Sequence, residues 1–160
     1  MIKIGFSTQK RNIMSRIIRH FTKSEVSHAW LLLDDPLFEC QMVMEASEFG
    51  LILTPFDKFR SKNDVITVIE PKAQLDTGIK AAGAWLGEAY DFGGLIGTAF
   101  VLFGRFLKRR WKNPFDSSTA MFCSEFVVKV MQASNYPGIE VFDAASTTPQ
   151  DVLDFMRSPT

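Results

Sequence analysis

The chain has 160 residues, of which 46% are hydrophobic and 22% are charged, a composition close to that of average soluble proteins that argues against a disordered or fibrous class. Its 18 lysines and arginines balance its 18 aspartates and glutamates, so the sequence lacks the basic excess with which proteins neutralise nucleic-acid phosphates. Domains commonly contain roughly 100 to 150 residues, so we expect residues 1–160 to form a single domain with one core.

The cysteine count and the chain start bound the chemistry and the location. Cys40 and Cys123 are too few for a disulfide framework and lack the spacing of zinc ligands, so we expect two free thiols and no metal. No phosphate-binding loop or dinucleotide fingerprint indicates a cofactor. Residues 1–10 lack the apolar stretch of a secretory signal, and the longest uncharged apolar run, 92–104, is shorter than the roughly 20 residues of a spanning helix. We therefore expect a cytoplasmic protein.

The first half of the sequence predicts a small, mostly antiparallel sheet. Apolar residues at helical spacing predict a helix over 12–22, and a helical turn is expected from Pro55. An Asp-Asp-Pro turn at 34–36 would join two strands into a hairpin. The strands are expected at residues 2–7, 26–33, 38–46, 51–53 and 65–69.

The second half predicts helices. Leu75, Ile79, Ala82 and Leu86 trace one helical stripe. Further helices are expected after Gly93, near Cys123 and from Thr148-Pro149. Strands followed by helices predict an α+β fold.

Cys123 begins an apolar helical run and is the candidate nucleophile. The hydroxyl residues at 117–119 can cap a helix, which would place the thiol in its first turn. Amides and the helix dipole at that end lower a cysteine pKa from its usual value of about 8.5. The alternative is a packed cysteine that shares a helix face with Val127 and Val130.

A cysteine nucleophile needs a base, usually a histidine oriented by a third polar group. His20 lies next to Arg19 on an expected solvated helix, whereas His28 begins an otherwise apolar strand. A buried imidazole costs free energy unless it has partners or a chemical role. His28 is therefore the candidate base, and a hydrogen-bonded core histidine is the alternative.

Glu45 is the candidate third residue, because the predicted hairpin brings its end of the return strand to His28. Glu39 lies near the turn and Glu48 lies beyond the strand end, so both are more simply interpreted as solvated. A structural role for Glu45 remains open at this point.

Three segments carry a resemblance to a known family: SHAWLLL at 27–33, VMEAS at 43–47 and FCSEFVVKV at 122–130. Together with Tyr90-Asp91-Phe92 they resemble the circularly permuted NlpC-type papain-like cysteine hydrolases, including the YiiX-like group, over residues 2–153. Ordinary papain-like enzymes carry the cysteine helix before the histidine strand, whereas the permuted branch has the order found here.

The resemblance implies a permuted papain-like fold with a small antiparallel sheet packed against a helical half that carries the cysteine helix. It implies Cys123 as nucleophile, His28 as general base and Glu45 as the acidic third residue. It also implies that the Cys123 amide helps to form an oxyanion hole. Tyr90 would lie near the substrate groove, although a turn with a packed aromatic residue explains it equally well.

Residues 92–112 are expected to form a helical insertion rich in Phe and Leu that ends in basic residues and Trp111. An apolar helix face with basic residues and tryptophan is typical of a helix at a membrane surface. The segment therefore predicts peripheral membrane contact, and its alternative is a core helix followed by a solvated basic loop.

These features predict a cysteine hydrolase, an amidase, peptidase or esterase, that cleaves a small peptide or lipid substrate through a thioester. The enzymatic alternative is a lipid acyltransferase or phospholipase-like enzyme of the same fold, as the lecithin:retinol acyltransferase relatives of the permuted branch indicate. A non-catalytic lipid-binding module with a packed Cys123 is the third possibility.

Overall fold

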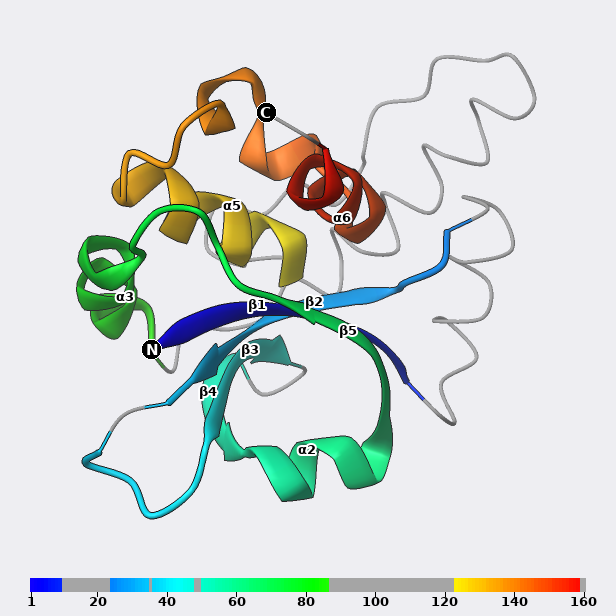
Figure 1. Cartoon of the computed structure of the whole chain (residues 1–160), viewed down its shortest axis with the longest axis vertical. Coiled ribbons are helices and arrows are strands. Elements are labelled where there is room, and N and C mark those ends of the chain that lie inside the picture. The colour runs from blue at the N-terminus through cyan, green and yellow to red at the C-terminus, as the bar shows by residue number, and fades with distance from the viewer. Residues whose placement is uncertain (10–23, 35, 48–49, 87–122, 159–160) are drawn as a thin grey trace.

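The computed structural model describes residues 1–9, 24–34, 36–47, 50–86 and 123–158 (Figure 1). The helix predicted over 12–22, Tyr90 and the insertion over 92–112 lie outside these described residues. Within them the fold is α+β, as expected, with a five-stranded antiparallel sheet and helices on both of its faces.

All five strands lie before residue 70, and their spatial order is β4-β3-β2-β1-β5. Every neighbouring pair is antiparallel, and the first strand lies between the second and the last. The strand bounds are β1 (Ile2–Gln9), β2 (His28–Leu33), β3 (Met42–Ser47), β4 (Gly50–Pro55) and β5 (Asn63–Ile69).

Helices cover the two faces unequally (Figure 1). One face carries α3 (Asp76–Ala82), α5 (Cys123–Ala133) and α6 (Pro149–Arg157), and the other carries α2 (Phe56–Lys62). Short 3-10 turns occupy Gly83–Trp85, Ile139–Val141 and Ala144–Ser146. No helix in the described ranges is both long and apolar enough to cross a membrane.

The hairpin between β2 and β3 differs from the prediction. Leu33 pairs with Met42, so the return strand begins at Met42 rather than at residue 38. Asp34 instead continues the pairing with β1, because its amide donates to the Met1 carbonyl oxygen at 2.8 Å. The connection is therefore an exposed loop that includes Leu37 and is wider than the Asp-Asp-Pro turn expected at 34–36.

Strand β2 supplies apolar side chains to both faces of the sheet, because successive strand residues point in opposite directions. Ala29 and Leu31 belong to the core under α5, whereas Trp30 belongs to a smaller cluster under α2. The Trp30 ring lies 4.7 Å from that of Phe59 on α2, centroid to centroid. By the same alternation His28, the first residue of β2, belongs to the α2 side, where its ring stacks against Phe59 at 6.2 Å.

Helices α3 and α5 approach each other closely at Gly78. Its amide donates to Ser134 Oγ at 2.8 Å, and a Cβ atom at this position would lie 2.0 Å from the Val130 carbonyl oxygen. Glycine is a poor helix former, so this close approach is the reason for its presence inside α3.

We expect Gly78→Ala to lower the free energy of unfolding by about 1–3 kcal/mol, the usual cost of overpacking, although alanine is the better helix residue. Gly83→Ala is the matched control, because Gly83 has helical dihedral angles and a Cβ atom there meets nothing within 4 Å. The control should leave stability unchanged or raise it by up to about 1 kcal/mol. Urea unfolding measures both, and equal stability of the two variants would contradict this account of the contact.

Candidate active site

The start of β2 and the start of the described part of α5 meet at one end of the sheet, and there the fold brings together Cys123, His28 and Glu45. All three residues are buried, with exposed fractions of 7%, 5% and 9%. Cys123 comes from α5, His28 from β2 and Glu45 from β3. The three sequence-predicted residues therefore occupy one site although they lie on three separate elements.

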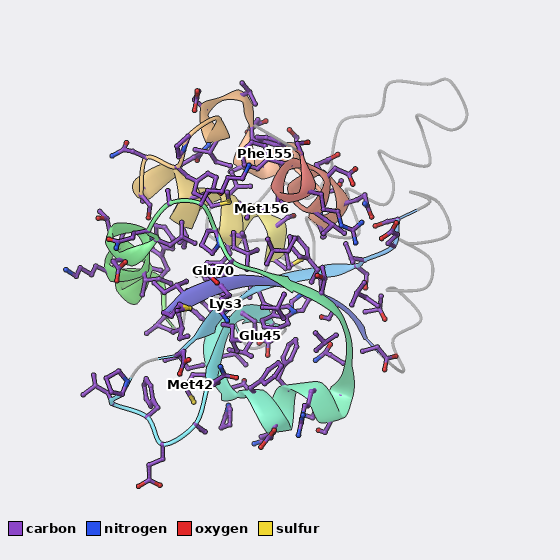
Figure 2. The ribbon with its side chains drawn as sticks, viewed as in Figure 1. Lys3, Met42, Glu45, Glu70, Phe155 and Met156 are labelled. Atoms are coloured by element: carbon purple, nitrogen blue, oxygen red, sulfur yellow. The ribbon has the colours of Figure 1, made fainter. Side chains whose placement is uncertain are left out.

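Glu45 contacts the imidazole of His28 directly. The His28 Nε2 atom lies 2.8 Å from Glu45 Oε2, at hydrogen-bond distance. The register Leu31↔Met44, continued along the strands, sets Ser47 opposite His28. Glu45 is then the diagonal neighbour on the same face of the sheet, within reach of a long side chain. Figure 2 shows Glu45 on β3 among the side chains of this region.

His28 also forms a hydrogen bond with the thiol of Cys123. A histidine held at one nitrogen by a carboxylate presents the other nitrogen in a fixed direction. This is the arrangement in which a carboxylate orients a base toward a nucleophile.

Burial lowers the pKa of His28, but the hydrogen bonds to Cys123 and Glu45, together with their negative charges, outweigh it and raise the pKa from 6.5 to about 10. Burial raises the pKa of Cys123, and the hydrogen bond and positive charge of His28 outweigh that effect and lower it. Both shifts favour the thiolate form of Cys123 and the imidazolium form of His28.

Two backbone amides add to the stabilisation of the thiolate. Hydrogen bonds from the backbone of Ala29 and Ser124 to the Cys123 sulfur lower its pKa further. Ser124 follows the cysteine on α5, and an amide in a first helical turn has no carbonyl partner within the helix. Ala29 follows the histidine on β2, so each amide neighbours one member of the pair.

Sequence reasoning missed some of the groups that surround the site. The ring of Phe59 flanks the imidazole, and Ser7 Oγ accepts a hydrogen bond from Trp30 Nε1 at 3.1 Å in the same layer. Nothing local marks Phe59 as a neighbour of His28, because α2 reaches it only through sheet packing. The contribution of the Ser124 amide could have been inferred from the sequence, since a cysteine in the first turn of a helix lies near amides without a carbonyl partner.

The remaining candidates lie elsewhere. Cys40 and Glu39 are exposed in the loop between β2 and β3. His20, Glu48 and Tyr90 lie outside the described residues. In the part of the chain that the structure describes, no group of three or more His, Cys, Asp or Glu residues is arranged to hold a metal ion.

Comparison with known proteins adds no relative. No protein-family model matches the sequence, and neither a curated protein nor a solved structure matches the chain.

Proposed function

We propose that this chain is a cysteine hydrolase that cleaves an amide or ester through a thioester on Cys123. The observation that carries the proposal is the buried series in which the thiol is hydrogen-bonded to His28 and His28 Nε2 lies 2.8 Å from Glu45. The α+β fold and the chain order, histidine strand before cysteine helix, are compatible with a permuted papain-like enzyme.

In the first half of the reaction the Cys123 thiolate attacks the substrate carbonyl carbon and forms a tetrahedral intermediate. The imidazolium of His28 then gives a proton to the leaving amine or alcohol as the carbon–heteroatom bond breaks, which leaves a thioester. Glu45 keeps the ring oriented and stabilises its positive charge throughout.

In the second half, water attacks the thioester carbonyl. His28, now neutral, accepts a proton from the water, and the sulfur departs as thiolate when the carbon–sulfur bond breaks. The product carboxylic acid leaves, and the proton on His28 restores the starting ion pair. No cofactor enters this cycle.

The energetics favour chemistry over simple packing. A cysteine that only filled space would need no charged partner, and a buried ion pair is often no more stable than apolar residues of the same volume. A buried histidine that shifts a thiol toward its reactive form, itself held by a carboxylate, is typical of functional sites. The packed-cysteine alternative leaves the presence of His28 and Glu45 beside Cys123 unexplained.

We expect iodoacetamide to label Cys123 rapidly well below about pH 8, where an ordinary thiol is mostly protonated. The exposed Cys40 is an internal control in the same molecule, and faster labelling of the more buried thiol requires activation. His28→Ala should slow labelling of Cys123 by about tenfold for each unit by which its pKa rises. Mass spectrometry of peptides from the protein labelled in its native state measures alkylation at Cys123 and at Cys40. A Cys123 rate unaffected by His28→Ala would refute the proposal.

The charge of Glu45 should appear in the titration of His28. In Glu45→Gln the amide can still accept the Nε2 hydrogen bond, but the negative charge is gone, so the pKa of His28 should fall below the value of about 10 in the parent protein. Glu39→Gln makes the same change at an exposed position and should leave the titration unaltered. NMR titration of the imidazole signals measures the pKa, and identical curves for the two variants would contradict the role of Glu45.

The thioester itself can be trapped with p-nitrophenyl acetate as a general acyl donor. We expect a burst of p-nitrophenol, with one acetyl group on Cys123 by mass spectrometry, and no burst in Cys123→Ser. Slow continued turnover in buffer supports hydrolysis. An acetyl-enzyme that persists until an amine or alcohol is added would indicate acyl transfer instead, and the absence of any adduct would favour a non-catalytic module.

A further inference from the structure

A short C-terminal segment, residues 147–150, contacts both of the elements that carry the proposed catalytic pair. On one side it meets α5 beside Cys123, and on the other it meets the chain just before His28. These two contacts are made by residues that are close together in the sequence at the start of α6. The segment therefore links the start of α5, beside Cys123, to the chain just before His28.

The contact on the cysteine side is a buried hydrogen bond. Ser124 Oγ donates to the Thr147 carbonyl oxygen at 2.7 Å, and Ser124 is only 3% exposed. Since Ser124 directly follows Cys123, this bond ties the start of α5 to the residue that precedes the N-cap of α6.

The contact on the histidine side is made by the side chain of Gln150. Its Oε1 atom accepts from the Glu25 amide at 2.8 Å and lies 3.0 Å from Ser24 Oγ. The hydroxyl of Ser24 in turn accepts from the Val26 amide at 3.2 Å, which shapes the turn that leads into β2. One amide oxygen thus orders the approach to His28.

Helix α6 is itself well fixed, which gives these contacts a firm base. Thr148 and Asp151 form a reciprocal capping box, and Pro149 occupies the first turn. Val152 and Leu153 are buried in the main core. Gln150 therefore projects from the capped first turn of the helix.

We propose that Gln150 is a positioning residue that holds the strand start carrying His28 at hydrogen-bond distance from Cys123. The inference rests on the proposed function, and it concerns the position of His28 relative to Cys123. Without the Gln150 oxygen, the Glu25 amide loses its acceptor, whereas the Ser24 hydroxyl keeps the Val26 carbonyl oxygen, and His28 moves relative to the thiol. Thr147, through Ser124, holds the other half of the pair.

The test compares two glutamines with the same substitution. Gln150→Met removes the acceptor of the Glu25 amide but keeps the length of the side chain, whereas Gln132→Met removes a hydrogen bond to the Phe142 carbonyl oxygen at the far end of α5. We expect Gln150→Met to lower the NMR-measured pKa of His28 and to slow alkylation of Cys123 by about tenfold for each unit by which the thiol pKa rises. Gln132→Met should leave both measurements unchanged even where it lowers the melting temperature.

Further variants separate the two ends of the Gln150 amide. Gln150→Glu keeps an oxygen acceptor for the Glu25 amide and adds a negative charge, so the pKa of His28 should be no lower than in the parent protein. Asp154→Ala removes the partner of Gln150 Nε2, which lies 2.8 Å away, and should have no effect on His28. Gln150→Asn, whose shorter side chain withdraws the acceptor, replaces Gln150→Met if the latter does not fold.

The outcomes distinguish this inference from the proposed function. Slow, His28-independent alkylation of Cys123 in the parent protein would overturn the proposed function. The His28 titration decides the inference in either case. A His28 pKa that is the same in Gln150→Met and Gln132→Met would overturn it, and a lower value in Gln150→Met alone, restored in Gln150→Glu, would support it.

Discussion

The buried proton-sharing contact between Cys123 and His28 is the interaction on which the site depends. Burial by itself works against both charges, lowering the histidine pKa and raising that of the cysteine. Hydrogen bonds and opposite charges offset this penalty, and the hydrogen bonds weaken steeply with distance and misalignment. Glu45 adds a further negative charge beside His28, so the raised pKa of the imidazole depends on all three groups keeping their geometry.

The sheet supplies much of that geometry. Strand β2 has neighbours on both sides, and its two faces are packed against separate apolar clusters. Trp30 fills the α2 side so tightly that a Cβ atom on Gly5 would lie 2.4 Å from its ring. A strand held in this way has little freedom to shift, and His28 at its first residue shares the constraint. The close contact between α3 and α5 at Gly78 restrains α5, the helix that carries Cys123.

The ends of elements are nevertheless their least restrained parts, and both members of the pair lie at such ends. In the turn just before His28, the Ser27 amide donates to the Ser7 carbonyl oxygen at 3.1 Å. The start of α6 adds the Gln150 contacts and the Ser124 bond at this place. A salt bridge from Arg157 to Glu25 at 3.0 Å extends the attachment, although an exposed pair of this kind contributes little energy. The C-terminal segment thus stabilises the region where elements would otherwise fray.

The sequence by itself determined the features that depend on neighbouring residues. Thr148 followed by Pro149 was enough to predict where α6 begins, and apolar or β-branched runs bounded by turn residues were enough to predict most strands. The identity of His28 and Cys123 as candidates also followed from local chemistry. Such signals can be recognised in the sequence because capping and periodicity depend on residues within one or two turns of the chain.

Tertiary structure decided the register and the long-range contacts. The hairpin predicted around residues 34–36 placed Glu45 near His28, but the real ladder begins at Leu33↔Met42 because Asp34 pairs with Met1. Glu45 reaches His28 as a diagonal neighbour, a relation that depends on register rather than on composition. The contact of Gln150 with Glu25 has no local signal at all. Its bonding groups meet only after the sheet and helices have packed, and no pattern of adjacent residues encodes that distance.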